Sequence, residues 1–202
     1  GKQVESESVG MNQKIDELEG LYKSFESETA AYRSEAACAK GCAFCCTDAG
    51  SIDITTLEGL RIRDAVARMP RARQMSVKKA VMRDMKKREA GGIAACPFLM
   101  KNKACMIYAV RPFACRRIYS LHRCSRDNPP LLSRRVVEQA QKVITALQRL
   151  DENGYTGHIS FVLHMLDAPA FRATYLAGEF KPEAIMAFGK THRIVINKMV
   201  VN

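Results

Sequence analysis

The side chains of this 202-residue chain best suited to chemistry are its eight cysteines, which all fall between residues 38 and 124. Four of them crowd into nine residues, as Cys38-x3-Cys42-x2-Cys45-Cys46. Thiolates bind soft or borderline metal ions well, and the Cys-x2-Cys spacing lets two sulfurs on one tight loop reach the same ion. The pattern therefore predicts a metal site. Its candidate ligands are Cys38, Cys42, Cys45, Cys46, Cys96, Cys105, Cys115 and Cys124.

The last four cysteines follow one another at steps of nine or ten residues, which is too wide for a local metal-binding loop. We expect them to fold back onto the first cluster, so that a bound metal cross-links separate segments of the chain. Adjacent side chains tend to diverge, and Cys45 and Cys46 are therefore not expected to bind the same ion. Either two sites of four sulfurs each or one site with spare thiols satisfies the pattern.

An even number of cysteines also fits a disulfide framework. Disulfide-dense scaffolds, however, are usually small secreted domains that lack a core, whereas 47% of the residues here are hydrophobic. Adjacent cysteines such as Cys45 and Cys46 bridge to each other only with strain. We therefore favour metal binding, and with it a reducing compartment and a cytoplasmic location.

Several helices must position these cysteines. Apolar residues at steps of three and four predict an amphipathic helix over residues 11–36, which ends directly before the first cysteine. Thr55 and Glu58 form a capping box that opens a second helix, ended by Pro70. A third helix is expected to follow to about Glu89.

The second half of the chain is also mainly helical. Residues 96–112 should be irregular, with one short strand near Ile107. Apolar spacing after Pro130 predicts a helix that ends near Gly154. Shorter helices separated around Pro169, Gly178 and Pro182 are expected beyond it. Residues 193–201 are ambiguous between helix and strand.

These elements predict a mainly α fold. We expect residues 1–202 to form a single domain of amphipathic helices around a loop-rich cysteine centre that the metal fastens. Residues 11–36 would be its N-terminal helix, and residues 38–124 the metal-binding region, with a basic helical insert at 55–89. Residues 131–202 would form a C-terminal helical region.

The order of the cysteine motifs resembles that of a known family. The first cluster is followed by Cys96-Pro97-Phe98-Leu99 and then by Cys105-x-Ile107-Tyr108-x2-Arg111-Pro112-x2-Cys115-Arg116. This order is similar to that of the YkgJ-type cysteine-cluster family, whose domain is described as zinc- or iron-chelating. The resemblance covers residues 38–124 and implies that all eight cysteines form the chelating set. Three residues separate Cys38 from Cys42 here, where many members of the family have two between their first two cysteines.

The resemblance implies a chelator and no particular reaction. The expected function is therefore metal binding, with zinc or iron as the cofactor in one or two sites, and a 4Fe-4S cluster as one alternative. A more distant similarity to the flagellin lysine methylases leaves a second class of function possible. In that class the protein is an iron-sulfur enzyme or an electron-transfer protein, with modification of protein lysines as one candidate reaction.

The charge of the chain suggests a partner. Its 32 Lys and Arg against 21 Asp and Glu give a net charge of +11. Residues 61–88 hold eleven of these basic residues and only two acids, Asp64 and Asp84. Such a positive surface attracts nucleic acid or an acidic protein surface, which is the alternative function of these helices. A solvated helix face is the simpler interpretation, because no aromatic residues are interleaved with the charges.

Basic residues near the last cysteines have a different expected role. Four thiolates on a divalent ion leave a net charge of about −2. The arginines that are expected to offset it and to donate hydrogen bonds to sulfur are Arg111, Arg116, Arg117 and Arg123. His122, two residues before Cys124, is a minor candidate ligand.

No apolar run approaches the ~20 residues needed to cross a bilayer, so no membrane partner is expected. The sequence shows neither a glycine-rich nucleotide loop nor a hydrolase grouping, and it leaves open whether the protein is an enzyme.

Overall fold

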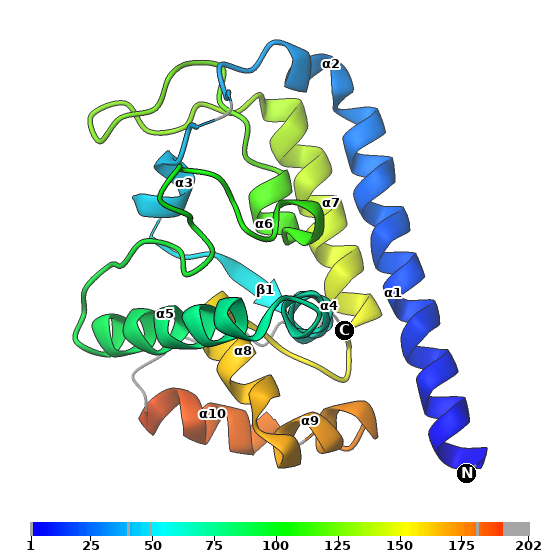
Figure 1. Ribbon diagram of the computed structural model, residues 1–202. Coiled ribbons are helices and arrows are strands. Elements are labelled where there is room, and N and C mark those ends of the chain that lie inside the picture. The colour runs from blue at the N-terminus through cyan, green and yellow to red at the C-terminus, as the bar shows by residue number, and fades with distance from the viewer. Residues whose placement is uncertain (1, 40, 49, 181, 192–202) are drawn as a thin grey trace.

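The computed structural model describes residues 2–39, 41–48, 50–180 and 182–191 (Figure 1). Ten α-helices and one two-stranded sheet form the regular structure of these residues, so the fold is mainly α, as predicted. The helices are α1 Lys2–Glu28, α2 Ala30–Ser34, α3 Phe44–Thr47, α4 Thr56–Ala67, α5 Arg71–Glu89, α6 Phe113–Arg116, α7 Arg134–Leu150, α8 Ile159–Asp167, α9 Pro169–Leu176 and α10 Pro182–Thr191. The strands are β1 Asp53–Thr55 and β2 Thr156–His158, and a 3-10 helix, η1, spans Tyr108–Val110.

The long helix α1 packs lengthwise against α7 (Figure 1). Its apolar face and that of α7 meet in one core cluster, which includes Leu18, Tyr22, Phe25, Val136, Ala140 and Leu147. The predicted helix over 11–36 is confirmed in type, but its limits differ. It begins at Lys2, and it is interrupted at Thr29, whose buried hydroxyl donates a hydrogen bond to the carbonyl of Phe25 at 2.7 Å. Such back-bonding competes with the helical backbone.

Helix α4 belongs to both cores of the molecule. Its predicted capping box is confirmed: the Thr55 hydroxyl accepts from the Glu58 amide, and the Glu58 carboxylate accepts from the Thr55 amide at 2.9 Å. Leu57 faces the α1–α7 cluster, while Leu60 and Ile62 belong to a second cluster with α5 and α8. This shared helix makes the two clusters parts of one domain.

Helix α8 crosses α4 at very short range. A β-carbon at Gly59 would lie only 2.6 Å from Cγ1 of Val162, so the missing side chain is what permits the contact. Beside this crossing, β1 pairs antiparallel with β2, with Asp53 opposite His158. The sequence did not predict this sheet, because strands of three residues are too short to show an alternating pattern.

A buried polar network attaches the basic helix α5 to the sheet. The carboxylate of Asp84 accepts hydrogen bonds from the Ser160 hydroxyl and from Nε2 of His158, the latter at 2.8 Å. The opposite ring nitrogen of His158 accepts from the backbone N–H of Ile52 at 3.2 Å. These two contacts assign the tautomer of the ring and give His158 a structural role.

The predicted strand near Ile107 is wrong. Residues 98–106 instead form a tight turn with a lone bridge between Leu99 and Cys105, and η1 follows. Lys103 adopts a positive φ of 61°, and the side chain of Asn102 accepts from the amide of Ala104 at 3.1 Å. This local bonding gives the chain a turn in place of a ladder.

The predicted helices after residue 130 are confirmed as α7 to α10. Pro169 begins α9, and Gly178 lies just beyond its end with a φ of +68°. Residues 193–201, which were ambiguous, lie outside the described residues. Within the described part of the chain, no helix combines the length and the apolar character that crossing a bilayer requires.

Candidate metal centre

All eight candidate cysteines belong to the described residues, and all eight are free thiols. The structure therefore gives no support to a disulfide framework. The cysteines occupy the loops and short helices around α3 and α6, in the part of the molecule with the least regular structure (Figure 1).

The first cluster lies in the loop after α2 and on α3. Cys38 and Cys42 are exposed, whereas Cys45 and Cys46, both on α3, are half-buried. Gly41, with a φ of +89°, turns the chain between the two exposed thiols.

The loop over residues 117–133 closes over this cluster. The backbone N–H of Ser120 donates to the sulfur of Cys38 at 3.2 Å, and the carbonyl of Ser120 accepts from the amide of Ala37 at 2.8 Å. Arg126 and Asp48 form an ion pair at 3.1 Å that ties the same loop to the end of α3. Cys124 is carried on this loop, and these contacts bring it to the first cluster.

The remaining cysteines surround the other side of α3. The N–H of Cys96 donates to the carbonyl of Cys46 at 2.7 Å, so two positions 50 residues apart are joined directly. The 98–106 turn returns the chain so that Cys105 lies beside this pair. Cys115 is on α6, whose first amide, that of Phe113, donates to the Glu58 carboxylate at 2.7 Å.

Cys45 has one set of electrostatic neighbours. Burial raises the pKa of its thiol to about 12, and nearby thiolate charge adds to the increase. The contributing thiols, in order of effect, are those of Cys124, Cys38, Cys46 and Cys42.

Cys46 and the late cysteines form another set of neighbours. The pKa of Cys96 is raised to about 12, mainly by burial, and charge on Cys46 and Cys105 contributes to the increase. Burial also raises the pKa of Cys115, and charge on Cys96, Cys46 and Cys105 adds to the effect ahead of charge on Cys45. For Cys46 itself, burial raises the pKa first and the strongest thiol neighbour is Cys105. Cys45 and Cys46 are adjacent in sequence, yet their strongest thiol neighbours differ, although Cys42 acts on both.

The thiols are neighbours without forming a closed coordination shell. Among the described residues, no three Cys, His, Asp or Glu side chains are grouped closely enough to hold an ion as they stand. The thiols nevertheless suit a soft cation. Each thiolate raises the pKa of the thiols near it, because the negative charges repel one another, and a cation bound between them would offset this repulsion.

The hydrogen bonds of the arginines near the last cysteines go mainly to backbone carbonyls and not to sulfur. Arg116 donates to the Glu26 carboxylate at 2.7 Å and to the carbonyls of Arg111 and Ala109, which fastens this segment to α1. The guanidinium of Arg111 lies 4.0 Å from the ring centre of Tyr108. Burial raises the pKa of the Cys105 thiol, and the charge of Arg111 opposes that increase. In the described structure these arginines donate no hydrogen bond to a sulfur atom.

The contacts of His122 do not support a role as a metal ligand. Its Nε2 lies 2.9 Å from the carbonyl oxygen of Pro129, so this nitrogen carries the proton and donates within its own loop. His158 belongs to the Asp84 network. His192 lies outside the described residues.

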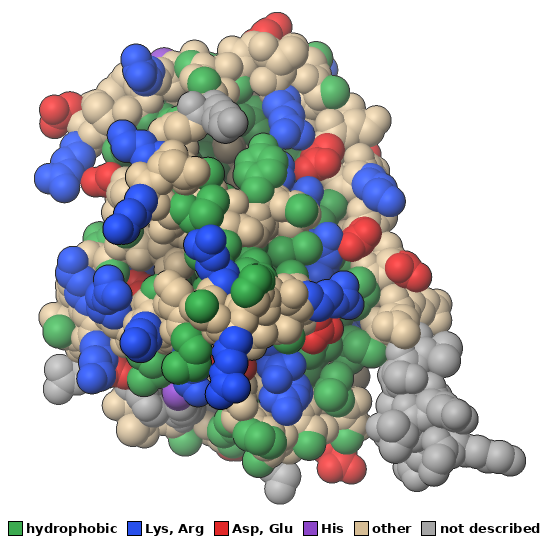
Figure 2. Space-filling model, viewed as in Figure 1, with side chains coloured by type: hydrophobic (Ala, Val, Ile, Leu, Met, Phe, Trp, Pro, Cys, Tyr) green, Lys and Arg blue, Asp and Glu red, His purple; other side chains and the backbone are tan. Residues whose placement is uncertain are grey.

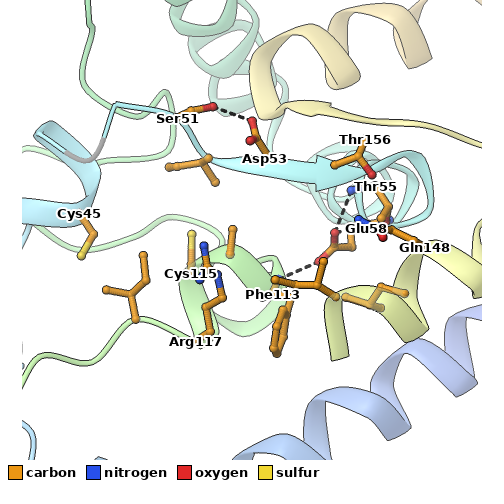
Figure 3. A pocket seen from close by; sticks show the side chains of 15 residues that line it. Cys45, Ser51, Asp53, Thr55, Glu58, Phe113, Cys115, Arg117, Gln148 and Thr156 are labelled. Atoms are coloured by element: carbon orange, nitrogen blue, oxygen red, sulfur yellow. Dashed lines mark hydrogen bonds between the residues drawn. The ribbon is translucent and has the colours of Figure 1, made fainter. Parts of the chain in front are cut away.

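A cavity of about 200 Å³ adjoins Cys45 and Cys115 (Figure 3). Arg117, Gln148 and Glu58 are among its lining residues, and no sequence pattern predicts a cavity role for any of them. Glu58 was identified only as a helix cap. Its carboxylate in fact also accepts from the Tyr22 hydroxyl at 2.6 Å and from the Phe113 amide. No sequence spacing links these positions, because they meet only in the tertiary fold.

The chain matches a family model described as "CxxCxxCC: Putative zinc- or iron-chelating domain" over residues 37–141. This match covers more than half of the chain and includes all of its cysteines. The protein therefore belongs to this cysteine-cluster family, and the resemblance seen in its sequence is confirmed. No curated protein and no solved structure matches the chain.

Proposed function

We propose that this protein binds zinc or iron at two sites of four thiolates each, and that the bound metal fastens its loops to α3. The first site would use Cys38, Cys42, Cys45 and Cys124. The second would use Cys46, Cys96, Cys105 and Cys115. The observation that carries this division is that the backbone of Cys46 is bonded to Cys96, whereas the loop that carries Cys124 is bonded to Cys38. In keeping with it, the strongest thiol neighbour of Cys45 is Cys124 and that of Cys46 is Cys105.

Backbone contacts support the first site. The bond between Ser120 and the Cys38 sulfur and the ion pair between Arg126 and Asp48 hold the 117–133 loop against the loop after α2. These two segments supply Cys38, Cys42 and Cys124, and α3, which directly follows the first of them, supplies Cys45. The loop over 117–133 has few regular hydrogen bonds of its own, so a metal bound here would contribute directly to its stability.

The second site has similar support. The bond between Cys96 and Cys46, the 98–106 turn and helix α6 bring three distant segments together. The two sets of thiols also influence each other: charge on Cys42 raises the pKa of Cys46, and charge on Cys45 raises the pKa of Cys115. The two sites would therefore be close neighbours that share α3.

Metal content and colour of protein purified without oxygen test this proposal. A closed four-thiolate zinc site is colourless and structural, while an iron-sulfur cluster absorbs visible light and bleaches on reduction. Two equivalents of zinc per chain, or two clusters with matching sulfide, support two sites. One equivalent contradicts the division, and metal-free folded protein contradicts metal binding. A cluster that cycles between redox states would favour electron transfer or an enzyme.

We also propose an anionic partner, an acidic protein surface or nucleic acid, for the basic helix α5. Figure 2 shows Lys and Arg side chains gathered over the face where Figure 1 places α5. Lys78, Lys79, Arg83 and Lys86 are exposed along one side of the helix, next to the half-exposed Met75. Replacing these four basic residues by Gln should abolish retention on heparin, with the metal content unchanged. Equal retention of wild type and variant would contradict this role.

A further inference from the structure

The cavity beside Cys45 and Cys115 lies between β1 and β2 on one side and α6 and α7 on the other (Figure 3). Its walls are largely apolar, with Phe113, Ile144 and Leu147 among them. An apolar cavity of about 150 Å³ holds a benzene-sized molecule, so about 200 Å³ has room for on the order of ten non-hydrogen atoms.

Gln148 is an unmatched polar group in this cavity. The residue is only 8% exposed, and no described residue forms a hydrogen bond with its amide. The buried side-chain atoms without a partner among the described residues are Nη1 of Arg61 and the hydroxyl of Tyr119, so the Gln148 amide is open to the solvent of the cavity. A ligand that displaces solvent from such an amide keeps its affinity only if it replaces the hydrogen bonds that water would make. A bound molecule with a hydrogen-bonding group would satisfy it.

Arg117 is an unmatched charge in the same cavity. Its neighbour Arg116 is held by Glu26 at 2.7 Å, whereas Arg117 forms no ion pair with a described residue. In Figure 3 the Arg117 nitrogens lie among the lining side chains near Cys115, and Gln148 lies on the opposite side of Phe113. A guanidinium that is partly withdrawn from water and has no acid partner favours an anionic ligand.

The other polar groups of the lining narrow the class of that anion. Glu58 accepts from the amides of Thr55 and Phe113, which are the free amides at the start of α4 and α6, and from Tyr22. Its carboxylate therefore has no capacity left for a ligand amine, and the amides of Thr55 and Phe113 are not free for a phosphate. Asp53, a second carboxylate in the lining, disfavours an anion with more than one charge. One guanidinium without backbone donors suits a monoanion such as a carboxylate.

We propose that this cavity binds a small bifunctional carboxylate. The carboxylate lies on Arg117, an apolar middle lies against Phe113 and Ile144, and a hydrogen-bonding group at the far end meets Gln148. This site is additional to the metal sites and holds its ligand beside a thiol from each of them, Cys45 and Cys115.

Three probes of matched shape test the proposal on the full chain with its metal. 4-Hydroxybenzoate has both end groups, benzoate lacks the hydroxyl, and 4-hydroxybenzamide lacks the charge. Calorimetry gives the affinities, and ¹³C-methyl resonances of Ile118 and Ile144 report occupancy of the cavity, with Ile93, exposed and outside the cavity, as the control. 4-Hydroxybenzoate should bind about threefold to tenfold more tightly than benzoate and at least about tenfold more tightly than the amide.

Two variants assign the two ends. Arg117→Gln should remove the preference for acid over amide, and Gln148→Leu should remove the preference for hydroxybenzoate over benzoate. Arg134→Gln and Gln141→Leu, exposed positions on α7, are the matched controls and should change neither preference.

The proposal is overturned by the absence of saturable binding, by equal affinity for acid and amide, by displacement with inorganic phosphate at similar concentration, or by preferences that survive both variants. If a variant does not fold, the comparison of the three probes on the wild type still decides. Metal content measured in the same samples keeps a failure of the metal proposal distinct from a failure of this one.

Discussion

Cys46 and Cys96 are joined through their backbones, with the N–H of Cys96 donating to the carbonyl of Cys46 at 2.7 Å. This bond places the second group of cysteines against α3, which also carries Cys45. Side chains of adjacent residues diverge, so one short helix presents a thiol to each of two neighbourhoods. If the two proposed sites form, the double cysteine of the motif lets them share α3 as one support.

Glu58 should contribute far more to the free energy of unfolding than an ordinary helix cap does. Its carboxylate joins α1, α4 and α6 through Tyr22, Thr55 and Phe113. Glu58→Gln removes the charge and turns an amide group toward donors, so we expect a loss of about 3 kcal/mol in the free energy of unfolding, measured in urea. Glu138→Gln on the surface of α7 is the control. A loss equal to that of the control would show that the buried carboxylate is not a structural junction.

The sequence predicted features whose signals are local. The Thr55–Glu58 capping box and the apolar repeat of α7 each depend on residues within a few turns of helix, and both appear as expected. The pairing of β1 with β2 joins positions about 100 residues apart, and no local pattern encodes it. The same holds for the cavity, because Arg117, just after α6, and Gln148, on α7, line it together only in the tertiary fold.

Gly59 is where α8 approaches α4 most closely. Gly59→Ala would place a β-carbon 2.6 Å from Cγ1 of Val162. Helix propensity alone would stabilise the variant by about 1 kcal/mol, but overpacking costs about 1 to 3 kcal/mol, so a lower melting temperature is expected. Val162→Ala in the same chain should restore part of that loss. If Gly59→Ala is more stable than wild type, α4 and α8 are less tightly packed at Gly59 than this 2.6 Å separation implies.

Asp151 should make stability depend on pH in an unusual direction. Burial raises its pKa to about 6, although Thr56, Leu57 and Tyr175 donate hydrogen bonds to it. The folded state therefore holds this proton more tightly than the unfolded state, whose pKa is about 3.9. The stability from this group is complete below pH 4 and is lost as pH rises through about 6.

Asp151→Asn removes this titration while keeping an acceptor oxygen. From pH 4 to pH 7, wild type should lose about 2 kcal/mol of unfolding free energy relative to the variant. Urea denaturation at several pH values gives the difference, in which the effects of other groups and of metal loss cancel. Parallel profiles for the two proteins would contradict the raised pKa.

The metal-to-chain ratio of wild type, Cys45→Ser and Cys46→Ser, purified side by side without oxygen, tests the central claim most directly. Each substitution removes one ligand from a different proposed site, and ligands drawn from separate segments make metal binding part of folding. Two separate sites predict two equivalents in wild type and one in each variant, with a lower melting temperature in both. Full metal content in either variant, or complete loss of metal from a single substitution, would contradict two separate sites of four thiolates.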